Sequence, residues 1–164
     1  MDMHRTCDLL NGLIKLDFDA IEAYEAALRR LDGEIVRTCL VAFLEDHRRH
    51  TRELSEQIRQ FGGTPATGPG LMGVLIEGAV VIGGLAHDKG ILRAMSRDEA
   101  FINHSYETAL EKLSAGTPCY DLVRKNREDE RRHKDWIDAV LIADDLEAGA
   151  RTARGDDHRS GLRR

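Results

Sequence analysis

Residues 128–133 read Glu128-Asp129-Glu130-Arg131-Arg132-His133 and lie in a segment, about 121–146, with continuous helical periodicity. Glu130 and His133 are three residues apart, so a helix places both side chains on one face. This Glu-x-x-His spacing is the arrangement by which one helix offers a metal ion a carboxylate and an imidazole. The stretch therefore predicts a helix that contributes to a metal site.

A copy of this stretch occurs upstream, where residues 45–50 read Glu45-Asp46-His47-Arg48-Arg49-His50. The two copies differ at one position, since His47 stands where Glu130 stands. Another matching pair precedes them, because residues 24–28 read Tyr-Glu-Ala-Ala-Leu and residues 106–110 read Tyr-Glu-Thr-Ala-Leu. The offset between copies is 82 residues for this pair and 83 for the other. Two copies of one helical hairpin are the simplest interpretation.

The composition favours an all-α protein. The chain has 164 residues, which is enough for one domain with a sizeable core. Charged residues make up 32% and prolines number only three, and the abundance of Ala, Leu, Glu and Arg favours helix over sheet. The net charge of −5 gives no reason to expect a nucleic-acid partner.

The cysteines and the start of the chain indicate a cytoplasmic location. Cys7, Cys39 and Cys119 are odd in number and widely separated, which fits a reducing cytosol better than a disulfide framework. No Cys-x-x-Cys occurs, which excludes a zinc ribbon or a rubredoxin-type iron centre. The N-terminus has no apolar run behind a basic start, so we expect no signal peptide.

Apolar spacing predicts a bundle over residues 1–146. The expected helices cover about 9–31, 34–61, 89–115 and 121–146, each with core positions that alternate by three and four residues. Residues 62–88 form the long crossover that joins the two hairpins, and such a crossover is required when the two middle helices run parallel.

Two further segments lie outside these helices. The apolar stretch 71–86 is expected to form a short helix packed on the bundle, with a partner or dimer surface as the alternative. A membrane span is not expected there, because the stretch is shorter than the ~20 residues that a spanning helix needs and contains Glu77. Residues 147–164 lose the periodicity and carry five arginines, so we expect a mobile basic tail.

Polar residues interrupt the apolar core positions at one level of the predicted bundle. They are Asp17, His47, His50, Glu99, Glu130 and His133. Each lies about 16 residues, roughly 24 Å, from the middle of its turn, so all six belong to one layer. Buried carboxylates and imidazoles are costly when unpaired, and a divalent cation removes most of that cost. The layer therefore predicts a metal site, with a metal-free polar layer that serves packing specificity as the alternative.

Other polar residues are expected to play smaller parts. Tyr24 and Tyr106 share the core positions and are expected as core aromatics, with a supporting or radical role near the metal as the alternative. Asn126, one turn before Glu130, is a candidate hydrogen-bond partner for it. The residues expected to be solvated are Asp19, Glu22, Glu25, His104, Glu107 and the arginine pairs 48–49 and 131–132.

The segment of about residues 9–146, with the polar residues named above, resembles the ferritin-like superfamily. The resemblance is in particular to rubrerythrin-like and small uncharacterised bacterial members built from two helical hairpins. The resemblance implies a four-helix bundle around two irons, in which the first and third helices each give a Glu and the second and fourth each give Glu-x-x-His. Glu99, Glu130 and His133 match directly, Asp17 matches with a shorter carboxylate, and His50 matches the second-helix His.

His47 departs from this pattern. It replaces a Glu that in the superfamily usually bridges the two metals, which leaves Glu130 as the bridging carboxylate. Three alternatives follow: Glu130 and a solvent-derived oxygen hold two irons, the site holds one metal, or it prefers another metal. The ligand types also suit Zn or Mn, so they do not choose among metals.

The resemblance implies a cytosolic non-haem di-iron or di-metal protein that reacts with dioxygen or peroxide, as a ferroxidase- or peroxidase-like oxidoreductase. One alternative is a metal-binding bundle without turnover. Another is a bundle that docks a partner, because residues 160–164 resemble the short C-terminal peptides that load ferritin-like cargo into bacterial protein shells. We expect a homo-oligomer, most simply a dimer, with no nucleic-acid partner and no membrane span.

Overall fold

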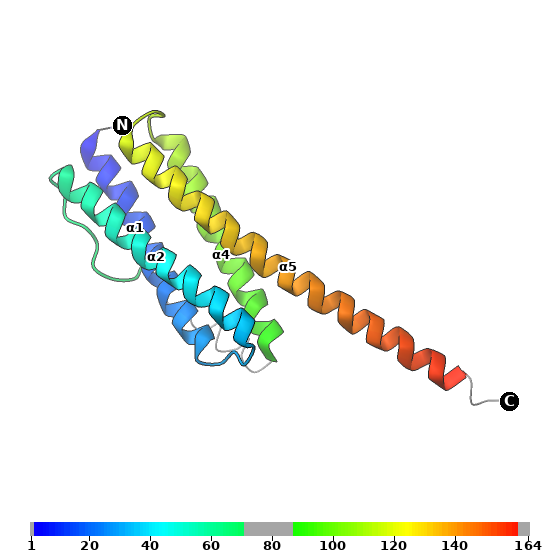
Figure 1. Cartoon of the computed structure of the whole chain (residues 1–164). Helices are drawn as coiled ribbons and strands as arrows, with labels where there is room; N and C mark the ends of the chain where they lie inside the picture. Colours follow the sequence, from blue (N-terminus) through cyan, green and yellow to red (C-terminus); the bar gives the residue numbers. More distant parts are fainter. Residues whose placement is uncertain (1, 71–86, 161–164) are drawn as a thin grey trace.

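The computed structural model describes residues 2–70 and 87–160. Within them the chain forms helices only: α1 (Met3–Leu28), α2 (Glu34–Gln60), α4 (His87–Lys112) and α5 (Pro118–Ser160) (Figure 1). Helices α1 and α2 form one hairpin and α4 and α5 form the other, and the hairpins pack with α1 against α4 and α2 against α5. The prediction of an all-α, ferritin-like four-helix bundle made of two hairpins is confirmed.

Local sequence signals set the helix boundaries. Asp2 caps α1, because its side chain accepts a hydrogen bond of 2.8 Å from the backbone N–H of Arg5. Gly62 follows α2 with a φ of 75°, a left-handed conformation that glycine adopts without strain. Thr117 accepts a hydrogen bond from the N–H of Tyr120, and Pro118 occupies the first helical position of α5. The Asp2 cap explains why α1 begins earlier than the residue 9 that apolar spacing indicated.

The core of the bundle follows the predicted apolar spacing. Leu10, Ile14, Leu40, Leu54 and Ile102 are each no more than 1% exposed. The central part of this core is polar and contains the residues described in the next section. None of the helices in the described ranges has a stretch long and apolar enough to cross a lipid bilayer.

The far end of α5 differs from the expected boundary. The apolar periodicity predicted an end near Leu146, but the helix continues to Ser160 and extends well past the other three (Figure 1). Three alanines and three arginines favour helix within residues 147–160 and no proline interrupts them, so the helix continues beyond the residues that form the core. The mobility of residues 147–164 stays a prediction. The expected short helix at 71–86 lies outside the described residues.

Candidate metal centre

Six buried polar residues form one layer across the bundle, which we call the central layer. Its members are Asp17 on α1, His47 and His50 on α2, Glu99 on α4, and Glu130 and His133 on α5. Each of them is at most 1% exposed. The structure thus brings together all six residues that the sequence placed at one level.

Four members of the central layer surround a point that we call position A, namely Asp17, His47, His50 and Glu130. Oδ1 of Asp17 lies 3.0 Å from Nδ1 of His47 and 3.4 Å from Nδ1 of His50. Oε1 of Glu130 lies 3.4 Å and 2.9 Å from the same two nitrogens. Donors bonded at ~2.0–2.2 Å to one tetrahedral ion lie roughly 3.3–3.6 Å apart. Position A therefore has about the size of a four-coordinate metal site.

A second point, position B, is surrounded by His47, Glu99, Glu130 and His133. Nε2 of His47 lies 3.6 Å from Oε1 of Glu99. Nδ1 of His133 lies 3.8 Å from that oxygen and 3.7 Å from Oε2 of Glu130. Position B is slightly wider than position A, and the two positions share His47 and Glu130.

Several atoms of the central layer are close together without hydrogen bonds. Within the described residues, no hydrogen-bond partner exists for Nε2 of His47, Nδ1 of His50, Nδ1 of His133, Oε2 of Glu99 and both carboxylate oxygens of Glu130. Buried polar atoms without partners are costly, and a metal ion would satisfy these nitrogens and oxygens together. The residues present therefore fit a metal at both positions.

Two buried tyrosines support the carboxylates from the opposite hairpin. The Tyr106 hydroxyl on α4 donates a hydrogen bond of 2.7 Å to Oδ2 of Asp17 on α1. The Tyr24 hydroxyl on α1 donates one to Oε1 of Glu99 on α4. Burial raises the pKa of both phenols well above the usual value, so both remain protonated donors. Beyond their expected place in the core, the tyrosines therefore hold the carboxylates of the layer.

Two aspartates that sequence reasoning missed support the histidines in the same crossed way. Nε2–H of His133 donates a hydrogen bond of 3.1 Å to Oδ2 of Asp46 on α2. Nε2 of His50 lies 3.3 Å from Oδ2 of Asp129 on α5. Each aspartate thus holds the histidine of the other hairpin, and the lone pair of each Nδ1 is left for the metal position. The signal was present in the sequence, because Asp46 and Asp129 occupy the same place in the two copies.

Two arginines complete what we call the acid–arginine cluster: Asp46, Asp129, Arg49 and Arg132. Arg49 donates to both aspartates, and so does Arg132. Arg132 is exposed, as expected, whereas Arg49 is half-buried and departs from the expectation of a solvated side chain. Both arginines close the layer on the side where α2 and α5 meet and balance the charge of the aspartates. Arg48 pairs instead with Glu25 and Glu45 nearer the surface.

Charges inside the layer compensate one another. Burial alone would lower the pKa of His50, yet surrounding carboxylates, with Asp129 the strongest, raise it to about 10. Burial would likewise lower the pKa of His47, but Glu130 and neighbouring carboxylates raise it well above the usual value. Burial would raise the pKa of Glu130, and the nearby imidazoles instead hold it well below its usual range. A cation that enters the layer must therefore displace imidazole protons.

Further side chains shape the surroundings of the layer. Phe43 stacks on His133 with ring centroids 4.3 Å apart. Asn103, another residue that the sequence did not single out, donates 2.9 Å hydrogen bonds to the backbone carbonyls of Glu99 and Glu130 and so ties α4 to α5. Asn126 is fully buried, but its amide makes no hydrogen bond to Glu130 within the described chain.

Asp19 was expected to be solvated, and this was wrong. Its side chain is only 1% exposed and accepts a hydrogen bond of 3.0 Å from the backbone N–H of Gly70. The contact explains the burial, because the loop that follows α2 covers this face of α1. His104 and Glu22 are exposed, as expected.

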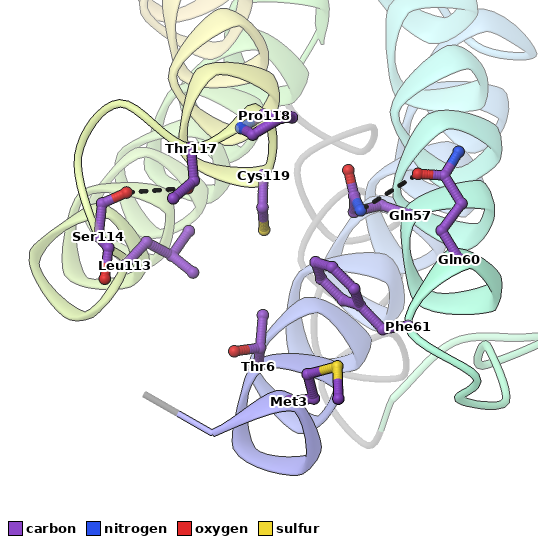
Figure 2. A pocket seen from close by; sticks show the side chains of 10 residues that line it. All are labelled: Met3, Thr6, Gln57, Gln60, Phe61, Leu113, Ser114, Thr117, Pro118 and Cys119. Carbon is purple, nitrogen blue, oxygen red and sulfur yellow. Dashed lines mark hydrogen bonds between the residues drawn. The ribbon is translucent and has the colours of Figure 1, made fainter.

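A separate cavity of about 560 Å³ lies at the end of the bundle where α1 and α5 begin. Its lining is mostly apolar, and Figure 2 shows Thr6, Phe61 and Cys119 directed toward the space between the two hairpins. Thr6 is 11 residues before Asp17 on α1, so this cavity lies roughly 16 Å along the helix from the central layer. Cys7, Cys39 and Cys119 are free thiols.

Comparison with known proteins agrees with this fold. The model of a family described as "Domain of unknown function (DUF2383)" matches residues 5–112. A ferritin-like, diiron-carboxylate protein from Bacillus anthracis is 22% identical, with a TM-score of 0.68 over 86% of this chain and 99% of that one. A dodecameric thioferritin, the bacterioferritin-related protein from Bacteroides fragilis, is 14% identical, with a TM-score of 0.70 over 92% of both chains. No curated protein matches the chain.

Proposed function

The chain belongs to the DUF2383 family, and on this premise we propose that it is a non-haem di-metal protein, with iron as the first candidate, that reacts with dioxygen or peroxide. The observation that carries the proposal is the pair of four-residue positions that share Glu130 in a buried layer. The metal ligands would be Asp17, His47, His50, Glu99, Glu130 and His133.

The geometry of the Glu130 carboxylate favours a site with two ions over a site with one. Its Oε1 faces Nδ1 of His50 at 2.9 Å, and its Oε2 faces Nδ1 of His133 at 3.7 Å. Neither oxygen has a hydrogen-bond partner among the described residues. Each oxygen is thus available to a different ion, and one carboxylate can bridge both positions.

The donor set mixes carboxylate oxygens with imidazole nitrogens, which suits Fe, Zn and Mn alike. Three carboxylates and three neutral imidazoles carry a charge of −3, which two divalent ions more than balance. A similar fold occurs in the Bacillus anthracis protein, whose description is diiron-carboxylate. This likeness makes iron the first candidate among these metals.

When bound, two irons supply electrons to dioxygen or peroxide. The chain's own residues orient and protect the site. Tyr24 and Tyr106 hold Glu99 and Asp17 with protonated hydroxyls, Phe43 stacks on His133, and the apolar core above and below the layer excludes water.

The test is oxidation of added Fe(II), followed by absorbance after mixing with dioxygen or with peroxide. We expect wild-type protein to oxidise Fe(II) at least about tenfold faster than the Glu130→Gln variant, which lacks the charged bridge. Glu128→Gln is the matched control, because Glu128 lies on the same helix and, among the described residues, forms its ion pair with Arg124 at the surface. Equal rates for Glu130→Gln and wild type would contradict the proposal.

His47 favours a second candidate function, a metal-binding bundle without turnover. An imidazole in place of the usual bridging carboxylate lowers the negative charge around the metals, which disfavours their higher oxidation states. Stoichiometric metal together with no reaction toward dioxygen or peroxide would support this alternative.

We also propose a cytoplasmic homo-oligomer. Free Cys7, Cys39 and Cys119 suit a reducing compartment. Ile142 and Leu146, on the part of α5 just before this extension, are 60% and 70% exposed, and a second copy that covers them is the simplest reason for their exposure. Light scattering after size-exclusion chromatography tests the assembly, and a monomer at micromolar concentration would contradict it.

A further inference from the structure

The repeat places His50 and His133 at matching positions, yet the side chains around these two histidines differ. His133 stacks on Phe43, and Trp136 follows His133 by three residues on the same face of α5. The residues at the corresponding places around His50 are Asn126 and Glu53. An aromatic pair therefore adjoins only one of the two histidines.

Phe43 and Trp136 form a continuous path of rings from His133 to the surface. The ring centroids of His133 and Phe43 are 4.3 Å apart with the planes stacked, and those of Phe43 and Trp136 are 5.6 Å apart with one edge facing the other ring. Stacked and edge-to-face contacts are the arrangements that aromatic rings prefer. His133 is fully buried, Phe43 is 7% exposed and Trp136 is half-buried. Each ring of the path is thus more exposed than the one before it.

The outer end of this path lies at a surface hollow of about 490 Å³. The residues that line the hollow are Glu128, Arg131, Arg132, Asp135 and Trp136. Two acidic and two basic side chains make the hollow neutral overall, so it does not repel solutes of either charge. Trp136 is the only tryptophan of the chain. A small solute in the hollow can therefore contact the one indole of the protein.

Indole and phenol are the aromatic side chains that lose an electron most readily. The tyrosines of the layer, Tyr24 and Tyr106, are only 2% and 0% exposed, so an external molecule does not reach them. Trp136 differs from them because it lines a surface hollow and also contacts Phe43, the ring stacked on a candidate metal ligand.

We propose that Trp136 is an electron-relay residue, which carries single electrons through Phe43 from a small reductant in the surface hollow to the metal held by His133. This inference rests on the proposed function, which supplies the oxidised metal. Trp136 gives one electron toward that metal and releases its indole proton to water. A water-soluble one-electron donor, such as ascorbate, then returns the electron, and water returns the proton. The reductant is thus oxidised by one electron and the metal is reduced by one.

Flash oxidation of Trp136 tests the relay without turnover. A photogenerated Ru(III) complex in solution removes one electron from the indole of the full-length, untagged protein loaded anaerobically with Fe(II). The absorbance of the indole radical is then followed. The same protein loaded with Zn(II) is the reference, because zinc has no redox chemistry. We expect the radical to decay at least tenfold faster with Fe(II) than with Zn(II).

Two variants assign the path. Trp136→Phe should give no indole radical, and ascorbate should reduce the oxidised iron form of this variant at least tenfold more slowly than that of wild type. Phe43→Leu should keep the radical but lose most of the difference between Fe(II) and Zn(II). Phe61→Leu is the matched control, because it replaces a half-buried ring at the separate end cavity, and it should behave as wild type. Circular dichroism verifies that each variant is folded.

The outcomes separate this inference from the proposed function. Equal radical lifetimes with Fe(II) and Zn(II), in wild-type protein that binds both metals and oxidises Fe(II), would overturn the relay and leave the proposed function in place. Unchanged reduction by ascorbate in folded Trp136→Phe protein would also overturn the relay. Failure of wild-type protein to bind Fe(II) or Zn(II) at all would overturn the proposed function, and the relay with it.

Discussion

The two hairpins make nearly the same contribution to the central layer, and the one difference lies at its middle. Tyr24 supports Glu99 across the bundle while Tyr106 supports Asp17 in return. The outer supports, Asp46 and Asp129, cross in the same way to reach the histidines of the opposite hairpin. A near-symmetric framework thus surrounds an asymmetric pair, His47 and Glu130. The comparison shows that two copies of a helical hairpin can keep the residues that hold the ligands of a site while they differ in a residue at its centre.

The largest expected effect comes from making the hairpins identical with His47→Glu. In metal-free protein this variant buries another carboxylate and removes an imidazole, so we expect the free energy of unfolding to fall by roughly 3–5 kcal/mol. Two equivalents of Fe(II) or Zn(II) should restore most of it, because cations neutralise the added charge. Urea denaturation with and without metal measures both changes.

His104→Glu is the control for this variant, since His104 is exposed on α4 and should tolerate the same exchange. A metal-free His47→Glu protein as stable as wild type would show that the layer does not depend on charge balance.

The next effect concerns the crossed aspartates. Asp46→Ala removes the partner of His133 and should weaken metal binding at position B by about 10–100-fold, whereas Asp129→Ala should weaken binding at position A by a similar factor through His50. Competition with a chelator measures both affinities. Asp135→Ala, at an exposed position of α5, should change neither. If Asp46→Ala instead weakened position A, which contains His50 of the same helix, and Asp129→Ala weakened position B, the crossed support would be wrong.

A smaller effect is expected from the tyrosines. Tyr24→Phe and Tyr106→Phe each remove one buried hydrogen bond to a carboxylate, so each should lower the free energy of unfolding of the metal-free protein by about 1–3 kcal/mol. Tyr120→Phe, in a partly exposed position, serves as the control. Similar losses of stability in both variants would support the two-fold correspondence of the hairpins. A loss in only one variant would contradict that correspondence at the tyrosines.

The last effect, at most about 1.4 kcal/mol for each pH unit, is on the pH dependence of stability. The pKa of His50 is raised to about 10 in the folded protein, against ~6.5 in the unfolded chain. This stabilisation is fully present below pH ~6.5 and is lost as the pH rises toward 10. The melting temperature of metal-free protein should therefore fall over this range, by ~2–4 °C for each kcal/mol lost. A His50→Gln protein should show a shallower decline, and an equally steep one would contradict the role of His50.

Much of the fold followed from the sequence, because apolar spacing and the internal repeat are properties of single helices and helix pairs. The six members of the central layer could be predicted since each occupies a core position at the same height. The roles of Asp46 and Asp129 were missed because their partners lie on the opposite hairpin, and hydrogen bonds across a bundle leave no spacing signal within one helix. Asp19 was missed because a loop contact from Gly70, not helix periodicity, buries it.

The length of α5 was also missed, for a different reason. Periodicity reports which residues face a core, so it ends near Leu146 where the core ends. The helix continues to Ser160 because no proline interrupts it and its alanines and arginines favour helix.

The most direct test of the account is the metal content of untagged protein, measured by elemental analysis beside a Glu130→Ala/His133→Ala variant. An affinity tag made of histidines would itself bind metal, so the tag must be absent. We predict close to two metal ions per wild-type chain, with iron the main element, and loss of most of this metal in the folded variant. Folded wild-type protein that holds no metal after growth with iron, and whose melting temperature neither iron nor zinc changes, would contradict the account and leave a purely structural polar layer.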